Sequence, residues 1–144
     1  MLALMYGKVF NDNDTIKFSQ RLLQGLLASL DYKNSSVKSD ASKDDNISVF
    51  TGVGAIIYLT YNFYKVIGDE FYIKKCKETM KNILETYKEK EMAFNDIDFL
   101  TGISSTLFVI SKIILNETIE KELLDLFNDV KLLYINTIKK YCND

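Results

Sequence analysis

A short glycine-containing segment occurs twice in this chain, about fifty residues apart. The first copy is Phe50-Thr51-Gly52-Val53-Gly54, the second is Leu100-Thr101-Gly102-Ile103-Ser104, and each opens a nearly unbroken apolar run. After each run the chain turns into a segment whose apolar residues recur every three or four positions, which is the spacing of an amphipathic helix. Two copies of this order predict a helical repeat architecture rather than one irregular domain.

Each repeat is predicted to hold an apolar inner helix followed by an amphipathic outer helix. The expected units are a repeat over 47–94, with helices over 53–64 and 71–87, and a repeat over 95–144, with helices over 103–115 and 119–141. Between the helices of the first repeat, Gly68-Asp69 is a helix-stop signal. Because the inner helices are apolar on nearly every side, we expect them to be surrounded by protein.

Residues 1–30 read as a partial repeat. Leu2 to Tyr6 matches the end of an inner helix, and an outer helix capped by Asp14 or Thr15 is predicted to reach Leu30. Its apolar residues share one face, and they are Phe18, Leu22, Leu23, Leu26, Leu27 and Leu30. The chain is therefore expected to be one domain that starts inside a repeat: a piece of a larger protein, a truncated reading frame, or a subunit that completes its core by association.

Apolar surface at the two ends of such a stack predicts that the chain associates with itself. Charged side chains in place of Leu2 and Leu4 are predicted to reduce this association without unfolding the repeat that contains Gly52. Between the partial repeat and the first full one, residues 31–46 are nearly all Ser, Lys, Asp and Asn. Such a segment has too little apolar surface to hold itself in place, so we expect a mobile surface loop.

Composition supports an all-α fold and excludes several function classes. The chain has no Pro and few Gly among 144 residues, which removes the main helix breakers. Its formal net charge is −2 and Arg21 is its only Arg, so no basic stripe is present for nucleic acid. The apolar runs are shorter than the ~20 residues that span a bilayer. Two distant cysteines and no signal-peptide pattern indicate the cytoplasm.

The candidate catalytic groups each have a structural alternative. Asp96 and Asp98 form a potential carboxylate pair, but two acidic residues just before a helix more often cap it. Gly52, Gly54 and Gly102 stand where a phosphate could bind at helix N-termini, yet no P-loop Lys follows, so close packing at the helix starts is favoured. A Ser-His-Asp triad is excluded because the chain has no His. No catalytic residue is assigned.

No metal site is predicted either, because Cys76 and Cys142 are far apart and zinc needs three or four convergent ligands. The aromatic residues of the inner helices are Tyr58, Tyr61, Phe63, Tyr64 and Phe108. They could line a peptide groove, although core packing is the commoner role at these spacings. Lys112 is unusual on an apolar helix, and it either extends to the surface or places a charge in a cavity. Tyr58, Tyr61 and Lys112 are the peptide-contact candidates.

The segment from Phe50 to Leu59, the stop at Gly68-Asp69 and the segment Asp98-Phe99-Leu100-Thr101-Gly102-Ile103-Ser104-Ser105 resemble consecutive repeats of the lanthionine synthetase C-like cyclases. The resemblance is greatest to the C-terminal cyclase domain of class II lanthipeptide synthetases. It covers most of the chain from Ile47 onward, and the helix from Thr15 to Leu30 fits the preceding outer helix. The resemblance implies an α/α toroid of seven repeats, of which this chain would supply about two and a half.

In that family the inner helices and their Gly-containing starts line a cavity in which a peptide Cys thiolate adds to a dehydrated Ser or Thr, on a zinc ion. The resemblance thus implies a role in lanthipeptide thioether-ring formation, with a precursor peptide or the rest of the synthetase as partner. The family's zinc is held by two Cys and one His of later repeats, and no residue here matches them, so the chain is expected to be inactive alone. Ala55 and Ser105 also stand where the family often has Gly. The alternative is a non-catalytic helical-repeat module that binds a peptide or protein.

Overall fold

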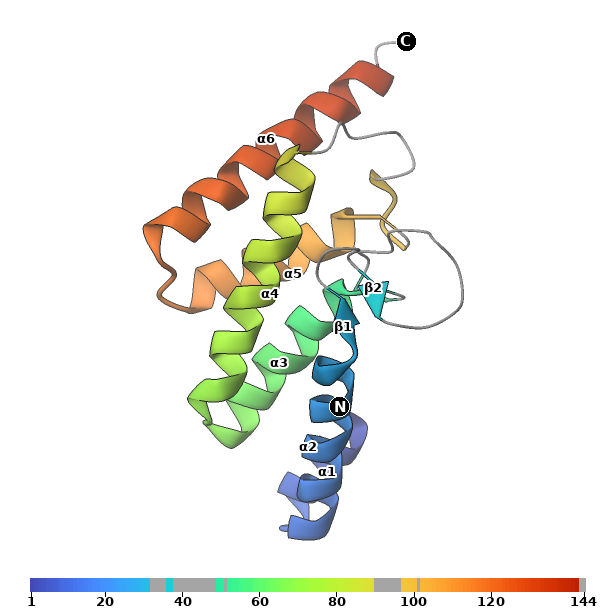
Figure 1. Ribbon diagram of the computed structural model, residues 1–144, viewed down its shortest axis with the longest axis vertical. Coiled ribbons are helices and arrows are strands. Elements are labelled where there is room, and N and C mark those ends of the chain that lie inside the picture. The colour runs from blue at the N-terminus through green and yellow to red at the C-terminus, as the bar shows by residue number, and fades with distance from the viewer. Residues whose placement is uncertain (32–35, 38–48, 51, 90–96, 101, 143–144) are drawn as a thin grey trace.

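The computed structural model describes residues 1–31, 36–37, 49–50, 52–89, 97–100 and 102–142. Three helical hairpins account for most of these residues (Figure 1), namely α1 (Leu2–Val9) with α2 (Asn13–Ala28), α3 (Gly54–Ile67) with α4 (Glu70–Glu89), and α5 (Ser104–Asn116) with α6 (Lys121–Cys142). A short antiparallel ladder, β1 (Leu30–Asp31) with β2 (Ser36–Val37), follows α2 and pairs Leu30 with Val37. The predicted all-α repeat fold is confirmed.

The hairpins stack side by side in two layers. The inner helix α3 contacts its own outer helix α4 and the next inner helix α5, while α4 contacts α6. The first hairpin contacts α3 through both of its helices, and it lies at the end of the molecule opposite α6 (Figure 1). This alternation of inner and outer helices is the arrangement of an α/α toroid-type repeat stack.

Two hydrophobic clusters hold the stack together. The larger cluster joins the second and third hairpins, and its buried members are Val53, Ile56, Ile57, Ile73, Cys76, Met80, Ile83, Leu84, Tyr87, Ile103, Leu107, Ile110, Ile113, Leu123, Phe127 and Val130. The smaller cluster joins the first hairpin to the second through Leu4, Leu23, Phe63 and Tyr72. Leu27 and Tyr64 pack against both clusters, so the apolar interior is continuous along the stack.

Short polar and glycine signals set the helix ends. Gly68 ends α3 in the left-handed conformation, with φ of 79°, and its amide donates to the Tyr64 carbonyl oxygen over 2.7 Å. Asp69 then starts α4, because its carboxylate accepts from the Phe71 amide at 2.9 Å. The cap of α2 is Asp12, which accepts from the amides of Asp14 and Thr15 at 3.1 Å each. The prediction that Asp14 or Thr15 caps this helix is therefore wrong.

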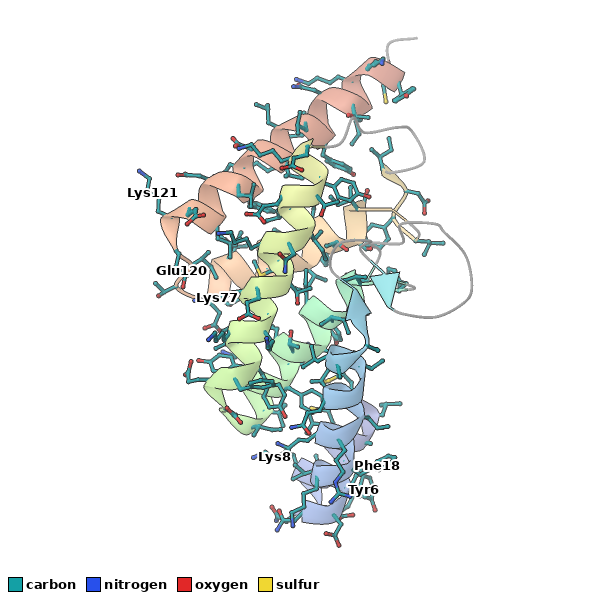
Figure 2. The ribbon with its side chains drawn as sticks, in the orientation of Figure 1. Tyr6, Lys8, Phe18, Lys77, Glu120 and Lys121 are labelled. Atoms are coloured by element: carbon teal, nitrogen blue, oxygen red, sulfur yellow. The ribbon has the colours of Figure 1, made fainter. Side chains whose placement is uncertain are left out.

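The predicted apolar face of α2 is largely uncovered. Leu23 is buried and Leu27 is half-buried, whereas Phe18 and Leu22 are more than half exposed and Leu26 is also exposed. The helix ends at Ala28, so Leu30 belongs to β1 and not to the helix. In Figure 2 the side chains of Tyr6 and Phe18 lie on the outside of the first hairpin. Periodicity identified the apolar side of α2, but no described element packs against most of it.

Parts of two predictions lie outside the described residues. The expected mobile loop over 31–46 falls on residues 32–35 and 38–46, apart from the short ladder, and Asp96 lies in 90–96. No helix in the described part of the chain combines the length and hydropathy that a membrane-crossing segment needs. The boundaries of the repeats stay predictions, although all three hairpins fall within them.

Candidate functional site

The two glycine segments, far apart in sequence, meet at the start of the inner helices. The backbone amide of Val49, just before the first segment, donates to Ser105 Oγ on α5 over 3.1 Å. The rings of Phe50 and Phe99 lie with centroids 5.8 Å apart, at an interplanar angle of 53°. Ser105 is buried, and its hydroxyl joins the two repeats by accepting this hydrogen bond.

Polar groups fix the second glycine segment. Asp98 Oδ1 accepts from the Leu100 amide at 2.8 Å, and the Asp98 carbonyl oxygen accepts from the Gly102 amide at 3.0 Å. The Ser104 hydroxyl donates to the Ile97 carbonyl oxygen, which leaves Tyr134 of α6 as the donor to Ser104 at 2.8 Å. Asp98 therefore orders the turn that leads into α5, which is a structural use of this carboxylate.

The predicted helix-start glycines lie where the inner helices are closely packed. Gly54 is the first residue of α3 and is buried, and Gly102, just ahead of α5, is buried too. Gly52 is half-buried, and its carbonyl oxygen accepts from the Ala55 amide at 3.1 Å. A side chain at a buried glycine would need space inside the packed interior. These contacts fit close packing at the helix starts.

An exposed aromatic surface surrounds these helix starts, and we call Phe50, Phe99 and Phe108 together with Lys112 the aromatic cluster. The rings of Phe99 and Phe108 have centroids 6.5 Å apart in an edge-on arrangement. Lys112 Nζ lies 5.5 Å from the Phe108 centroid, within the range of a cation–π contact. About half of each Phe is exposed to solvent, from 48% for Phe99 to 60% for Phe50. The cluster thus combines apolar area with one positive charge.

Tyr58 and Phe108 occupy equivalent positions in the two repeats. Each stands six residues after the Gly that follows Thr in its segment, Gly52 or Gly102. Tyr58 is 44% exposed and Phe108 is 53% exposed. An aromatic side chain that stays exposed at the same place in both inner helices contributes little to the core, so it is available for contact with a ligand.

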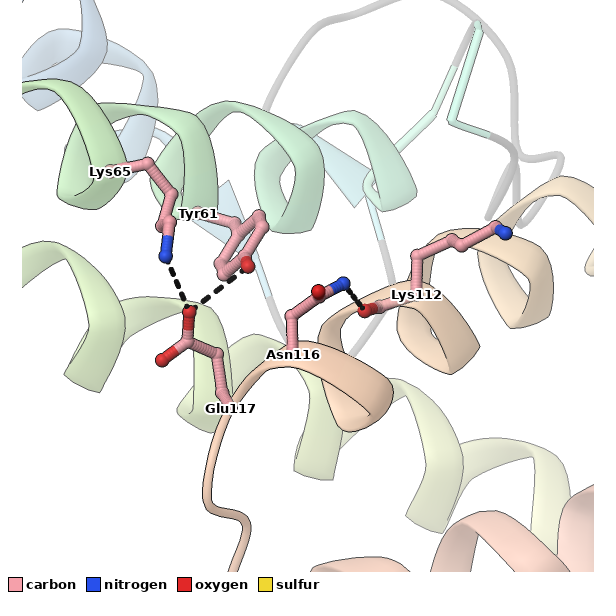
Figure 3. Close-up of polar contacts among 5 residues, drawn as sticks. All are labelled: Tyr61, Lys65, Lys112, Asn116 and Glu117. Atoms are coloured by element: carbon pink, nitrogen blue, oxygen red, sulfur yellow. Dashed lines mark hydrogen bonds and ion pairs between the residues drawn. The ribbon is translucent and has the colours of Figure 1, made fainter.

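Tyr61, a second peptide-contact candidate, forms a hydrogen bond with another part of the fold (Figure 3). Glu117, in the turn after α5, accepts from the Tyr61 hydroxyl and from Lys65 Nζ, each at 3.0 Å. Partial burial, followed by the bond to Glu117, raises the pKa of Tyr61 to about 12. The bond from Lys65 lowers the pKa of Glu117. This trio fastens α3 to the α5–α6 turn, and the side chain of Lys112 points away from it.

No zinc site is formed by the residues that the structure describes. The chain has no His and two Cys, and the described residues contain no cluster of three His, Cys, Asp or Glu side chains suited to a metal. Cys76 is fully buried on α4, and burial raises the pKa of its thiol to about 12. A cysteine that binds zinc does so as the thiolate. Cys142 is exposed on the last turn of α6.

Purified without a chelator, the chain is expected to contain far less than one zinc ion per molecule. The reason is the absence of converging His or thiolate ligands among the described residues. Elemental analysis by mass spectrometry of the monomeric fraction measures this ratio directly. Near-equimolar zinc that survives dialysis would contradict the prediction.

A second surface feature is a groove of about 510 Å³ between α4 and α6, with Ile73 and Leu123 among its lining residues. Two of its lysines are already paired, Lys77 with Glu120 at 2.9 Å and Lys81 with Glu122 at 2.8 Å. Figure 2 shows Lys77 and Glu120 pointing toward each other across the helices. Because these charges neutralise one another, the groove is a seam between repeats and a weaker candidate for ligand binding than the aromatic cluster.

Sequence reasoning identified Tyr58 and Lys112, and it also noted Phe108, but it missed Phe50 and Phe99. A signal for both existed, since each precedes a Thr-Gly pair by at most two residues and lies outside the apolar helices. Of the aromatic residues considered, Phe63 is buried in the core, whereas Tyr58 and Phe108 are exposed. The prediction that these aromatic residues pack in the core therefore holds for Phe63, but it does not hold for Tyr58 and Phe108.

A family model described as lanthionine synthetase C-like protein matches residues 1–141. No curated protein and no solved structure matches the chain.

Proposed function

Because this chain belongs to the lanthionine synthetase C-like family, we propose that it forms a peptide-binding part of a lanthipeptide cyclase, in which the aromatic cluster holds the substrate peptide. The observation that carries this proposal is that the two glycine segments lie close together. Phe50 therefore contacts Phe99, Phe99 contacts Phe108, and Lys112 lies over the Phe108 ring. Aromatic rings give a peptide large contact area at small cost in conformational entropy.

The chemistry of the cluster suits an extended peptide. Exposed rings on two consecutive repeats can contact successive apolar or small side chains, while the Lys112 ammonium attracts a carboxylate or a carbonyl oxygen. Beneath the platform, Ser105 accepts a hydrogen bond from the Val49 amide and Tyr134 donates one to Ser104, which fixes the two segments relative to each other. A preformed surface of this kind loses little entropy when a ligand binds.

We assign this chain a binding role and no zinc ligand. In the family, zinc supplies a thiolate nucleophile for ring closure when it is bound. The only thiols in this chain are a buried Cys76 and a distant Cys142, so its residues do not fit that ion. Both cysteines are free, which supports a reducing compartment such as the cytoplasm. The chain alone should therefore bind peptide without closing a ring.

Phe108→Ala is expected to weaken peptide binding about tenfold, which corresponds to about 1.4 kcal/mol, because truncation removes the ring that links Phe99 to Lys112. The probe is a fluorescein-labelled fifteen-residue peptide with Ser, Thr and one Cys, titrated by fluorescence anisotropy. Phe18→Ala is the matched control, since Phe18 and Phe108 are similarly exposed, at 56% and 53%, but lie on different hairpins. Equal loss in the two variants would contradict the proposed site.

The alternative function is a non-catalytic module that binds a peptide or protein outside any cyclase, and the absence of zinc ligands favours it. A thioether assay separates the two functions. A peptide with one Cys and one dehydroalanine is incubated with zinc and a zinc-containing cyclase of the family, with and without this chain. Faster or redirected ring closure in its presence supports the cyclase role. Peptide binding without any effect on ring closure favours the alternative.

A further inference from the structure

The ion pairs between the second and third hairpins all have the same polarity. Among the described residues, four ion pairs cross this boundary. In each, the lysine lies on the second hairpin and the carboxylate on the segment from 117 to 129. The pairs are Lys65–Glu117, Lys77–Glu120, Lys81–Glu122 and Lys88–Asp129, with N–O distances from 2.6 to 3.0 Å. Beside them, apolar residues such as Ile73, Leu123 and Phe127 fill the interior.

The last part of α6 also carries lysines beside apolar residues, but no carboxylate pairs with these lysines among the described residues. Leu132, Ile135 and Lys139 are spaced so that they share one face of the helix. Leu132 is 58% exposed and Ile135 is 38% exposed, and Lys131 and Lys140 flank them. We call these five residues the α6 basic face. From Lys131 to Cys142 the sequence contains no Asp or Glu, so the face carries a net positive charge.

The position of this segment favours an external partner. Lys88 pairs with Asp129, and among the described residues no ion pair joins α4 to the part of α6 after Asp129. Helix α6 continues to Cys142. In Figure 1 this end of α6 projects away from the second hairpin. Lys131 does contact Asn128 and the Phe127 ring, and Lys140 lies over the Tyr141 ring. None of these contacts supplies a negative charge.

We propose that the α6 basic face binds an acidic amphipathic helix of a partner protein, with carboxylates of that helix beside an apolar stripe. The same combination of lysines, carboxylates and apolar residues joins α4 to α6 inside this molecule. A second copy of the chain is a poor occupant, because symmetric pairing of this face with itself would bring lysines of one copy close to lysines of the other. The first hairpin is no better, since Lys8, Lys17 and Arg21 outnumber Asp12 and Asp14 there.

The test uses the full chain and an eighteen-residue helical peptide with a leucine stripe flanked by glutamates, followed by fluorescence anisotropy. The double variant Lys139→Gln/Lys140→Gln is expected to bind at least tenfold more weakly, and Leu132→Ser is expected to weaken binding severalfold. Lys121→Gln is the matched control, because it removes one exposed positive charge at the opposite end of the same helix and should change nothing. Raising the salt concentration should weaken binding by the parent and have less effect on the double variant.

Three outcomes would overturn the proposal. The first is equal binding by the parent and by the Lys139→Gln/Lys140→Gln variant. The second is equal binding of a control peptide in which lysines replace the glutamates. The third is lysine-dependent binding to phosphatidylcholine–phosphatidylserine vesicles that the acidic peptide does not displace, which would identify a membrane contact instead. Unchanged circular dichroism melting of each variant ensures that a loss of binding reflects the surface and not the fold.

Discussion

Leu4→Ala is expected to lower the free energy of unfolding by about 2–5 kcal/mol, whereas Leu2→Ala, two residues away on the same helix, should change it by less than about 0.5 kcal/mol. Leu4 is fully buried in the cluster that joins the first hairpin to Phe63 and Tyr72. Leu2 is 89% exposed. Truncation at Leu4 therefore removes packed contacts and leaves a cavity, whereas truncation at Leu2 removes a side chain that is already in water.

Urea unfolding followed by circular dichroism measures both changes, and the chemistry of the two substitutions is identical. If Leu4→Ala were as harmless as Leu2→Ala, the first hairpin would not be packed on α3 in solution. A separate early transition in Leu4→Ala alone would show instead that the smaller cluster unfolds before the larger one. That result would agree with the position of the smaller cluster at one end of the stack.

The burial of Leu4 also changes how self-association should be tested. A charge at Leu4 would unfold the smaller cluster, because an unpaired carboxylate there loses its hydration. The expected double substitution at Leu2 and Leu4 would therefore not leave the fold intact, and Leu2→Asp alone is the informative variant. Self-association through the exposed side of the first hairpin stays a prediction, and light scattering of the parent and Leu2→Asp tests it.

The sequence predicted the helices well because each carries a local signal. The apolar runs, the stop at Gly68 and the two glycine segments depend on neighbouring residues. In the part of the chain that the structure describes, the helices lie close to the expected ranges. The choice of cap for α2 failed within one turn, since Asp12, Asp14 and Thr15 all have suitable side-chain oxygens. Only the path of the backbone decides which oxygen meets the free amides.

Long-range features could not be predicted in the same way. Periodicity shows which side of α2 is apolar, but it does not show whether another element covers that side, and most of it is exposed. The contact between Phe50 and Phe99 depends on how two repeats are placed in space. The hydrogen bond from Tyr61 to Glu117 also depends on how two repeats are placed in space. Because of this bond, the Tyr61 hydroxyl is used within the fold rather than for contact with a peptide.

Cys76 is expected to react with iodoacetamide at neutral pH about a thousandfold more slowly in the folded chain than in urea. Its Sγ lies 3.6 Å from the Ile57 carbonyl oxygen and 3.8 Å from Met80 Sδ, within the larger cluster. Burial disfavours the charged thiolate and raises the pKa of this thiol from the ordinary 9.0 to about 12. At neutral pH, this rise lowers the thiolate population by a factor of about a thousand.

Mass spectrometry of peptides from a labelling time course measures both thiols in one sample, with the exposed Cys142 as internal control. Cys142 should be modified within the first time points, while modification of Cys76 should be far slower in the folded chain and should accelerate in urea. In Met80→Ala, a cavity beside the sulfur should speed the labelling of Cys76 and leave Cys142 unchanged. Equal labelling of both thiols in the folded parent would show that the α3–α4 interior is open. That result would also remove the argument that Cys76 is too deeply buried to bind a metal, and with it one of the two reasons for assigning this chain a binding role alone.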